Sequence, residues 1–427
     1  MDSDHDLVAD LTARGLIHDS TDQGFLSARL ASGPIGVYVG FDPTADSLHA
    51  GHLLGQLALR RFQLAGHRPF PLAGGATGMI GDPGGRSEER NLLDRETLEH
   101  NLSCITPQLE RLLDFSGPNG ATLVDNATWT AEISALDFLR DVGKHITVNQ
   151  MMAKDSVRSR LEGDSGISYT EFSYMLLQAN DFRYLHATYG VEMQMGGSDQ
   201  WGNITAGIDL IRRTTGQAAH GLTWPLLLRS DGQKFGKSTG GAVWLDPAQT
   251  SPYQFRQFWV QTDDDVIGRY LMWFSTRPLE ELHAVIAEHS ERPERRIGQR
   301  ALARELTELV HGPEAADAAD AAADVLFGGD PTHAPAAVLD AVRAEVPAST
   351  IAADDLDDPI DLLLSTGLAT SRSDARRLLE ARSTRVNGRQ LELGDRLADV
   401  DPLHGRYLLL RKGKHTYHVV EISPARG

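Results

Sequence analysis

The pattern of apolar and polar positions predicts a strand, a helix and a second strand near the start of the chain. Residues 35–41 have an apolar side chain at every second position, which is typical of a strand. Residues 47–65 have the spacing of an amphipathic helix that Asp46 or Ser47 can cap, and residues 67–75 follow as a second strand. This strand–helix–strand unit indicates a parallel sheet that helices cover.

Similar patterns continue along the rest of the chain. Residues 121–129 and 191–199 are strand candidates with long helical stretches between them. Residues 1–33 are predicted to be helical and solvent-facing, and residues 255–327 to be wholly helical. Residues 328–358 are rich in Ala, Asp and Pro and have few large apolar side chains, which predicts a linker.

We therefore expect an α/β fold in which a parallel-sheet domain precedes a helical domain and a small α+β module. The predicted parts are an N-terminal helical segment (1–33), the parallel-sheet domain (34–250), the α-helical domain (251–330), the linker (331–355) and the C-terminal module (356–427).

The composition narrows the class of protein. The 427 residues are 41% apolar, and the formal net charge of −18 argues against a surface coated with basic residues, so any nucleic-acid site must be local. The single cysteine, Cys104, excludes an internal disulfide framework and a zinc site built on several thiolates. The acidic N-terminus has no apolar core and the chain has no apolar run of about 18 residues. We expect a cytoplasmic protein that does not enter a membrane.

The C-terminal module has the opposite charge balance. Residues 371–415 contain 11 Arg and Lys against 6 Asp and Glu. A helix with arginines on its exposed face runs into the turn sequence RVNGRQ, at 385–390. A compact basic module in an acidic chain favours RNA binding, and the alternative is a charged face that only meets solvent.

Two histidines stand three residues apart at the start of the predicted helix 47–65. His49 and His52 should project together from its first turn, where free backbone N–H groups and the helix dipole favour anions. Gly51 between them leaves room for a flat ligand to reach the backbone. The pattern favours phosphate binding. A chance surface pair and half of a metal site are the alternatives, although zinc needs three or four ligands.

A lysine-containing loop at 229–241, RSDGQKFGKSTGG, is a second candidate for phosphate binding. Lys234 and Lys237 bracket two residues, Ser238 follows, and glycines lie on both sides. The loop is not a Walker motif, because its glycine and lysine spacing is one residue short. An exposed flexible turn is the alternative, but the loop and the histidine pair together favour a polyphosphate ligand.

These motifs resemble a known family. HAGH at 49–52 and KFGKS at 234–238 resemble the paired signatures of class I aminoacyl-tRNA synthetases, and the departures from the usual forms carry no charge. The stretches YVGFDPTADSLHAGH, GGATGMIGDPGGRSEER, TEFSYMLLQANDF and QMGGSDQWGNI are similar to those of bacterial tyrosyl-tRNA synthetases. The resemblance covers nearly the whole chain. It implies a Rossmann-like catalytic domain, a helical anticodon-binding domain and a C-terminal RNA-binding module of a ribosomal-protein-like type.

A polar stripe on one predicted helix is consistent with this resemblance. Tyr174, Gln178 and Asp181 are spaced 0, +4 and +7, so they share one face. The core side of the helix is expected to hold Phe172, Met175, Leu176, Ala179 and Phe182. By itself the stripe is equally typical of a solvent-facing surface, but a phenol, an amide and a carboxylate can converge on one small polar ligand.

The family resemblance implies a role for each residue of an amino-acid site. Tyr174, Gln178 and Asp82 would hold the ammonium group of tyrosine, and Tyr38 and Asp181 its phenolic hydroxyl. A buried site built to hydrogen-bond a hydroxyl leaves its own groups unpaired when phenylalanine enters, so it rejects that amino acid.

The implied reaction has two steps. The tyrosine carboxylate attacks the α-phosphorus of ATP and expels pyrophosphate, and the adenylate then passes its tyrosyl group to the terminal ribose of tRNA-Tyr. The expected catalytic residues are Thr44, His49, His52, Arg86, Lys234 and Lys237. ATP is expected to meet Gly40, Asp42, Gly51, Gly197, Asp199, Gln200, Lys237 and Ser238, with Mg²⁺ arriving on the nucleotide and no metal site built by the protein.

The resemblance also implies partners outside the nucleotide site. The candidate tRNA contacts are Lys154, Arg158 and Arg212 near the acceptor end, and Arg372, Arg376, Arg377 and Lys412 in the C-terminal module. A homodimer formed through the nucleotide-binding domain is expected.

Three alternatives stay open on the sequence. Pantothenate synthetase-like and cytidylyltransferase-like nucleotidyltransferases also begin a helix with H-x-G-H, but they do not explain the basic module or the polar stripe. A tryptophanyl-tRNA synthetase is a nearer rival whose substrate has an indole N–H and no phenol. An RNA-binding or splicing factor derived from a synthetase is expected to lose part of the histidine or lysine signature, and this chain keeps both.

Overall fold

The structure is a computed structural model, and it describes residues 6–83, 93–162, 166–227, 237–238, 241–352 and 358–423. Of residues 237 and 238 it describes the backbone alone. Two compact units make up the chain: Met1–Thr250 with Phe258–Leu306, and Ser251–Gln257 with Thr307–Gly427. Among the described residues, no helix combines the length and the hydropathy that crossing a membrane requires.

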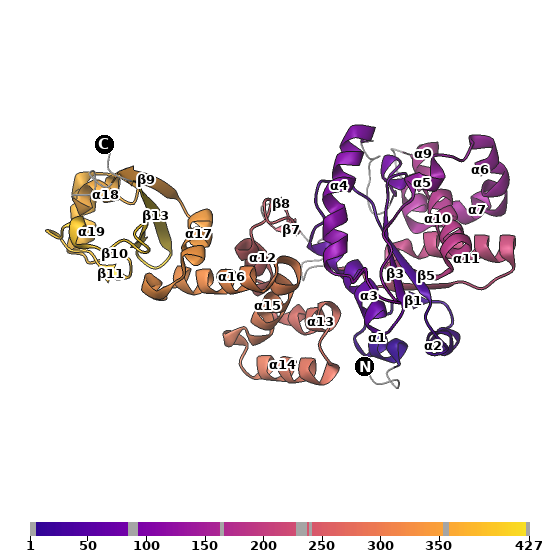
Figure 1. Ribbon diagram of the computed structural model, residues 1–427, viewed down its shortest axis with the longest axis horizontal. Helices are drawn as coiled ribbons and strands as arrows, with labels where there is room; N and C mark the ends of the chain where they lie inside the picture. The colour runs from indigo at the N-terminus through magenta and orange to yellow at the C-terminus, as the bar shows by residue number, and fades with distance from the viewer. Residues whose placement is uncertain are drawn as a thin grey trace. The chain divides into compact units, whose positions relative to one another are not determined.

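A six-stranded sheet forms the centre of the first unit (Figure 1). Its strands are β1 (Asp19–Ser20), β2 (Gly36–Phe41), β3 (Arg68–Ala73), β4 (Val124–Asp125), β5 (Val191–Gly197) and β6 (His220–Trp224). They lie in the order β1-β6-β5-β2-β3-β4, and all neighbours are parallel except β1 and β6. The predicted parallel sheet is confirmed.

Helices cover both faces of this sheet, with α3 and α4 on one side and α10 and α11 on the other (Figure 1). The helices that lie wholly in the first unit are α1 (Leu7–Ala13), α2 (Gln23–Ala31), α3 (Leu53–Leu64), α4 (Arg95–Arg111), α5 (Ala127–Thr130), α6 (Ala135–Asp141), α7 (Val148–Met152), α8 (Asp155–Glu162), α9 (Tyr169–Phe172), α10 (Tyr174–Tyr189), α11 (Trp201–Thr215), α13 (Asp264–Phe274) and α14 (Leu279–Glu291). Both faces of β2 are therefore buried, which explains why Tyr38 and Val39 are equally shielded from water.

The predicted helical region 255–327 is confirmed. Besides α13 and α14 it contains α12 (Pro252–Val260), α15 (Ile297–His311) and α16 (Pro313–Leu326). Helices α12 and α15 have residues in both units.

Three details of the first unit differ from the sequence prediction. Residues 1–33 are not simply solvent-facing, because Leu7, Leu11 and Leu26 are buried and β1 pairs with β6. Strand β6 has no counterpart among the predicted strands. The predicted strand 121–129 shortens to β4, and α5 follows at once, which turns Trp129 inward.

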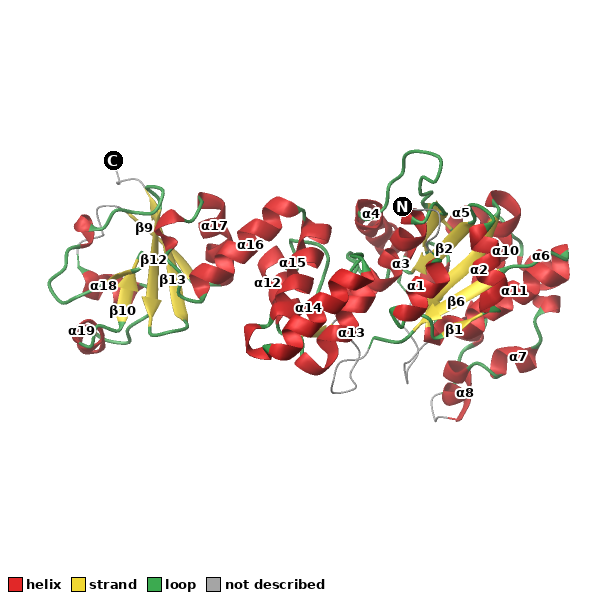
Figure 2. Ribbon diagram, turned by 90° about the horizontal axis from the view of Figure 1, so that it is seen from below, coloured by secondary structure: helices red, strands yellow, loops and turns green. Residues whose placement is uncertain are grey.

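The second unit contains a five-stranded sheet of its own (Figure 2). The strands are β9 (Ala348–Ala352), β10 (Thr384–Val386), β11 (Arg389–Gln390), β12 (Tyr407–Lys412) and β13 (Thr416–Ser423), in the order β11-β10-β12-β13-β9. The helices α17 (Ala336–Glu345), α18 (Pro359–Ser365) and α19 (Arg372–Glu380) accompany it. The turn predicted at RVNGRQ joins β10 to β11, and both of its central residues, Asn387 and Gly388, have a positive φ.

Alternation along β12 divides the core of the second unit between two faces. Leu408 and Leu410 pack in a cluster with α18 and α19, whereas Tyr407 and Leu409 pack in a cluster with α16 and α17. Both faces of the sheet are therefore covered by helices.

The predicted linker 331–355 is wrong for most of its length. Residues 336–345 form α17, whose Val338, Leu339 and Val342 are buried, and residues 348–352 form β9, which pairs with β13. Three apolar side chains on one face are enough to anchor α17, and β9 is held by backbone hydrogen bonds. The amino-acid composition of this segment therefore reveals neither the helix nor the strand.

Candidate active site

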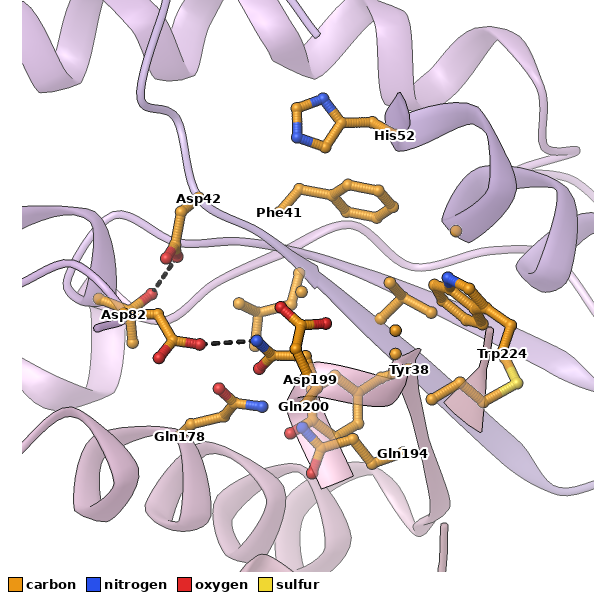
Figure 3. Close-up of a pocket in the computed structure, with 18 of the residues that line it drawn as sticks. Tyr38, Phe41, Asp42, His52, Asp82, Gln178, Gln194, Asp199, Gln200 and Trp224 are labelled. Carbon is orange, nitrogen blue, oxygen red and sulfur yellow. Dashed lines mark hydrogen bonds between the residues drawn. The ribbon is translucent and has the colours of Figure 1, made fainter. Parts of the chain in front are cut away.

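A cleft of about 390 Å³ opens in the first unit at the carboxyl ends of β2 and β5. The chain leaves these neighbouring parallel strands in opposite directions, toward β3 and β6, which creates a crevice between them. The walls come from β2, the turn with the two histidines, α10 and the end of β5 with the short helix η4 (Ser198–Gln200). Figure 3 shows these side chains converging from several elements.

The two histidines meet at one side of this cleft. His49 caps the short helix η1 (Ala50–His52), and α3 continues from it. The imidazole rings stack with centroids 3.9 Å apart, so the predicted convergence is present. The predicted cap at Asp46 or Ser47 is wrong, because the imidazole of His49 itself accepts the hydrogen bond from the Gly51 backbone.

The capping geometry also fixes the tautomer of each neutral ring. The Gly51 backbone N–H donates to His49 Nδ1 over 3.0 Å, and the His49 backbone N–H donates to His52 Nδ1 over 3.1 Å. Because each Nδ1 accepts, each neutral ring carries its proton on Nε2. Burial, and after it the neighbouring His49, lower the pKa of His52 well below its ordinary value, so His52 is a neutral donor at pH 7.

The chain that follows the lysine motif returns beside the histidine turn. Ala50 donates its backbone N–H to the Val243 carbonyl over 2.8 Å, and Leu245 donates to the Leu48 carbonyl over 2.8 Å. The hairpin of β7 (Lys237–Ser238) and β8 (Gly241–Ala242) leads into this segment. Tertiary structure thus brings the segment that follows the lysine motif close to the histidine turn.

Several predicted phosphate contacts lie outside the described residues. These are Arg86, Lys234 and the side chains of Lys237 and Ser238. Thr44 is described: it is exposed in the turn after β2, and its backbone N–H donates to the Asp42 carbonyl over 2.8 Å.

The polar stripe on α10 faces the cleft, as Tyr174, Gln178 and Asp181 all line it. The expected core residues Met175, Leu176, Ala179 and Phe182 are all buried. Phe172 packs against the cluster that holds Met175, Leu176 and Ala179, whereas Phe182 packs in the cluster of Tyr38. The solvent-facing alternative for the stripe is therefore excluded.

Asp181 is buried at the deep end of this stripe and is held from behind. Asn126 Nδ2 donates to its Oδ2 over 2.9 Å, and Trp129 Nε1 donates to its Oδ1 over 2.8 Å. Burial raises the pKa of Asp181 to about 7 against the opposing effect of these two hydrogen bonds. The inward turn of α5 after β4 places both donors.

Tyr38 and Gln194 form the floor of the cleft from neighbouring strands. They are register partners on β2 and β5, so their side chains leave the same face of the sheet. Both are almost fully buried, and neither the Tyr38 hydroxyl nor Gln194 Oε1 has a hydrogen-bond partner among the described groups. Burial, and after it the Asp181 charge, raise the pKa of Tyr38 well above its ordinary value. Sequence reasoning missed Gln194, whose only signal was its place in a strand beside Tyr38.

Asp42 also lines the cleft, just after the end of β2. Its Oδ2 accepts from the Tyr174 hydroxyl over 2.8 Å, and its Oδ1 accepts from Thr77 Oγ1 over 2.7 Å. The loop after β3 passes so close that a Cβ on Gly74 would lie 2.2 Å from Asp42 Oδ1, which explains the glycine.

Asp82 lies at the centre of a buried polar network. Lys154 Nζ donates to its Oδ1 over 2.8 Å, and Gln200 Nε2 donates to its Oδ2 over 2.6 Å. Asn203 contacts both partners of this carboxylate. Lys154 is 8% exposed and its ammonium is engaged inside the protein, so the predicted contact with tRNA would require it to leave both of its partners.

The end of β5 closes the remaining wall. Gly197, Asp199 and Gln200 line the cleft, in agreement with the expected position of the GGSD stretch. Burial, and after it the Asp82 charge, raise the pKa of Asp199.

Comparison with known proteins decides the family. The family model "tRNA synthetases class I (W and Y)" matches residues 30–328, and a model of the "Tyrosine--tRNA ligase SYY-like C-terminal domain" matches residues 339–420. The tyrosine–tRNA ligase of Roseiflexus castenholzii is 49% identical over 97% of this chain and 99% of its own, and that of Opitutus terrae is 51% identical over the same shares. The chain belongs to the tyrosine–tRNA ligases.

The predicted resemblance and enzyme class are thereby confirmed, and the chain is a class I aminoacyl-tRNA synthetase. A solved structure, the C-terminally truncated mitochondrial tyrosyl-tRNA synthetase of Aspergillus nidulans, is 34% identical with a TM-score of 0.68 and covers 75% of this chain and 94% of its own. A tryptophanyl-tRNA synthetase of Encephalitozoon cuniculi shares the fold with a TM-score of 0.55 at 14% identity, covering 73% of this chain and 89% of its own. Membership of the tyrosine–tRNA ligases removes this rival and the other nucleotidyltransferases.

The remaining candidate tRNA contacts of this ligase are on its surface or near it. Arg158 and Arg212 pair with nearby acidic side chains on their own helices. On α19, Arg372, Arg376 and Arg377 are exposed. Lys412 is half-buried, and its Nζ donates to the Leu368 carbonyl over 2.7 Å.

Proposed function

We propose that the cleft activates L-tyrosine with ATP and then transfers the tyrosyl group to tRNA-Tyr, with the phenol recognised at the floor and the phosphates at the histidine turn. The observation that carries this assignment is the buried Tyr38 hydroxyl beside Asp181, which has no hydrogen-bond partner within the described part of the chain. Figure 3 shows Tyr38 and Gln194 at one end of the drawn residues and His52 at the other, the order that a tyrosine and a nucleotide laid end to end would need.

The phenol of tyrosine supplies what the floor lacks. Its O–H donates to Asp181, which Asn126 and Trp129 hold in place, and its oxygen accepts from the Tyr38 hydroxyl. Phenylalanine leaves the buried Tyr38 hydroxyl unpaired, at a cost of about 1–3 kcal/mol, and offers Asp181 no donor beyond Asn126 and Trp129. The preference for tyrosine follows from this penalty.

The α-ammonium of tyrosine binds where polar groups of α10 and the Asp82 network meet. Asp82, Tyr174 and Gln178 all line this part of the cleft, and a charge-assisted hydrogen bond to a carboxylate is the strongest interaction available there. The substrate carboxylate then points toward the histidine turn.

Adenylate formation needs no protein nucleophile or general base, because the substrate carboxylate is already an adequate nucleophile. It attacks the α-phosphorus, the bond to the bridging oxygen breaks, and pyrophosphate leaves with the electron pair. The Nε2–H groups of His49 and His52 donate to phosphate oxygens as charge builds up on them. Thr44, Arg86, Lys234 and Lys237 complete this set as proposed phosphate contacts.

The adenosine moiety occupies the wall formed by the ends of β2 and β5. We assign it to Gly40, Asp42, Gly51, Gly197, Asp199, Gln200 and Ser238, with Asp199 at the ribose. Mg²⁺ enters with the nucleotide phosphates, whose oxygens it prefers as ligands.

The transfer step needs tRNA and a second copy of the chain. Exposed arginines of α19 and the exposed Arg158 and Arg212 contact tRNA phosphates, with 251–330 and the C-terminal module as the docking parts.

Apolar side chains on α6, α7 and α9 are strongly exposed, with Leu136 at 79%, Val148 at 59% and Tyr169 at 69%. We propose that they form the contact of a homodimer, since such a patch on a single copy marks an interaction surface. The enzyme works in the cytoplasm, where translation takes place.

ATP–pyrophosphate exchange measured with each amino acid tests the proposed function. Tyrosine alone should support rapid exchange, and Tyr38→Phe should lower kcat/KM for tyrosine roughly 2- to 12-fold, the value of one neutral hydrogen bond. The value of kcat/KM for phenylalanine should rise, because the variant has no buried hydroxyl for that substrate to leave unpaired, so the ratio of the two substrates narrows. An unchanged ratio would contradict the assignment of the floor to the phenol.

A further inference from the structure

Lys154 is a buried cation with no part in the reaction as described so far. It lies between α7 and α8, and its side chain is 5% exposed. Its ammonium donates to Asp82 Oδ1 over 2.8 Å and to Asn203 Oδ1 over 2.9 Å. Two short hydrogen bonds in a buried setting hold this group firmly, because an ammonium without them would be costly to bury.

Asn203 joins this lysine to three residues of the cleft wall. It is fully buried on α11, and its Nδ2 lies 2.9 Å from Gln178 Oε1, 3.0 Å from Gln200 Oε1 and 3.3 Å from Asp82 Oδ2. Asp82, Gln178 and Gln200 line the cleft, whereas Lys154 and Asn203 are not among its lining side chains. The pair is therefore a second layer directly behind the proposed ammonium site.

The charge of the cleft explains why a cation is needed in that layer. Asp42, Asp82, Asp181 and Asp199 all line the cleft, and the lining residues that the structure describes include no lysine or arginine. Four carboxylates in a shielded space repel one another, and a positive charge behind one of them lowers that repulsion.

We propose that Lys154 is a positioning residue for the α-ammonium of tyrosine and that it acts through Asp82. Asn203 orients Gln178 and Gln200 beside the same carboxylate. Lys154 holds the Asp82 carboxylate in one orientation, in which it accepts a hydrogen bond from the substrate ammonium. This inference rests on the proposed role of Asp82. It replaces a direct contact between Lys154 and tRNA, for which the ammonium would have to leave both of its buried partners.

Gly202 on α11 leaves room for the side chain of Lys154. The three heavy atoms nearest to a Cβ added to Gly202 would all belong to Lys154: Cγ at 3.3 Å, and Cβ and Cδ at 3.8 Å. Gly202→Ala therefore presses first on the lysine stem, while alanine suits the helix better than glycine. The variant displaces the ammonium without removing its charge.

The test uses the full-length enzyme, first without tRNA, so that amino-acid binding is separated from RNA binding, and then in aminoacylation assays that give KM for tRNA. Exchange kinetics are compared for the parent, Lys154→Met, Lys154→Arg and the control Lys144→Met, which changes an exposed lysine of the same region. Two competitive inhibitors report on the two ends of the substrate: tyrosinol keeps the ammonium, and 3-(4-hydroxyphenyl)propionate keeps the carboxylate.

Lys154→Met should raise KM for tyrosine and Ki for tyrosinol about 10- to 100-fold, the range for hydrogen bonds to charged groups. Ki for the propionate should stay within about twofold, because that inhibitor has no ammonium. Lys154→Arg should recover part of the loss, and Lys144→Met should match the parent. Equal weakening of both inhibitors would show a merely structural role, and unchanged exchange with a raised KM for tRNA would restore the RNA-contact assignment; either result overturns the proposal.

Two further variants keep the test decisive. If Lys154→Met does not fold, Gly202→Ala takes its place, with an expected rise of about two- to fivefold in KM for tyrosine and no change for the propionate. Asp82→Asn distinguishes failure of the proposed ammonium site from failure of the role assigned to Lys154. If Asp82→Asn does not weaken tyrosinol selectively, the proposed ammonium site fails. If it does and neither Lys154→Met nor Gly202→Ala follows it, only the role of Lys154 is refuted.

Discussion

His52 offers a way to separate support of the fold from catalysis within one side chain. Its Nδ1 accepts the His49 backbone N–H over 3.1 Å, and its Nε2–H is left for the phosphates. Asparagine places an amide group where Nδ1 lies and has nothing at the position of Nε2, whereas alanine has neither. His52→Asn therefore keeps the cap and loses the donor, and His52→Ala loses both.

The two functions of the ring have different magnitudes. A donor that acts mainly on the charge of the transition state is worth about 2–4 kcal/mol, or roughly 30- to 900-fold in rate. The capping hydrogen bond is worth about 0.5–2 kcal/mol of unfolding free energy. Both variants should thus slow adenylate formation roughly 30- to 900-fold with little change in KM for ATP. Only His52→Ala should lose stability.

Stopped-flow measurement of adenylate formation and thermal unfolding of the same samples check both expectations. Because burial holds the pKa of His52 well below its ordinary value, the rate difference between parent and His52→Asn should be constant from pH 6.5 to 8. A rate for His52→Asn within twofold of the parent would refute the assignment. So would equal loss of stability in the two variants, since the cap would then not depend on Nδ1.

Three other predictions concern pH and the second unit. KM for tyrosine should fall as pH rises through about 7, the raised pKa of Asp181, because the ionised carboxylate accepts the phenol more strongly; KM for phenylalanine should not follow. Burial, and after it the Arg29 charge, lower the pKa of His67 to about 4. As pH falls from 6.5, His67 therefore takes up a proton in the unfolded chain before it does so in the folded chain. Unfolding free energy should therefore drop between pH 6.5 and 4, and less steeply in His67→Asn. Removal of 356–427 should give an aggregating chain, because it exposes the apolar face of α17 and the edge of β9, whereas removal of 328–427 should leave exchange largely intact and abolish tRNA charging.

Each of these expectations has a contrary result. A common pH dependence for both amino acids would remove Asp181 from the phenol site. Identical slopes of stability against pH in the parent and His67→Asn would show that this ring does not titrate between the two states. Equal loss of exchange and charging in the shorter chain would refute the separation between the cleft and the C-terminal module.

The sequence predicted the parts of this enzyme that depend on local pattern. Alternation at 35–41 and the helical spacing after it were enough for the parallel sheet, and the polar stripe of Tyr174, Gln178 and Asp181 was visible at 3.6-residue spacing. The pairing of His49 with His52 also follows from local geometry. The family itself could be identified from short motifs, several of whose residues line the cleft.

Only the tertiary structure decided which groups support those motifs. Lys154 looked like a surface cation until a distant carboxylate and amide were brought to it, and Gln194 became part of the floor only through its register with Tyr38. The linker around α17 was misread because its few apolar side chains meet a sheet whose strands lie much later in the chain. The pattern of apolar and polar residues shows which face a residue shares with its near neighbours in sequence. Burial and hydrogen bonding between residues far apart in the chain arise only when helices and strands pack together within a unit.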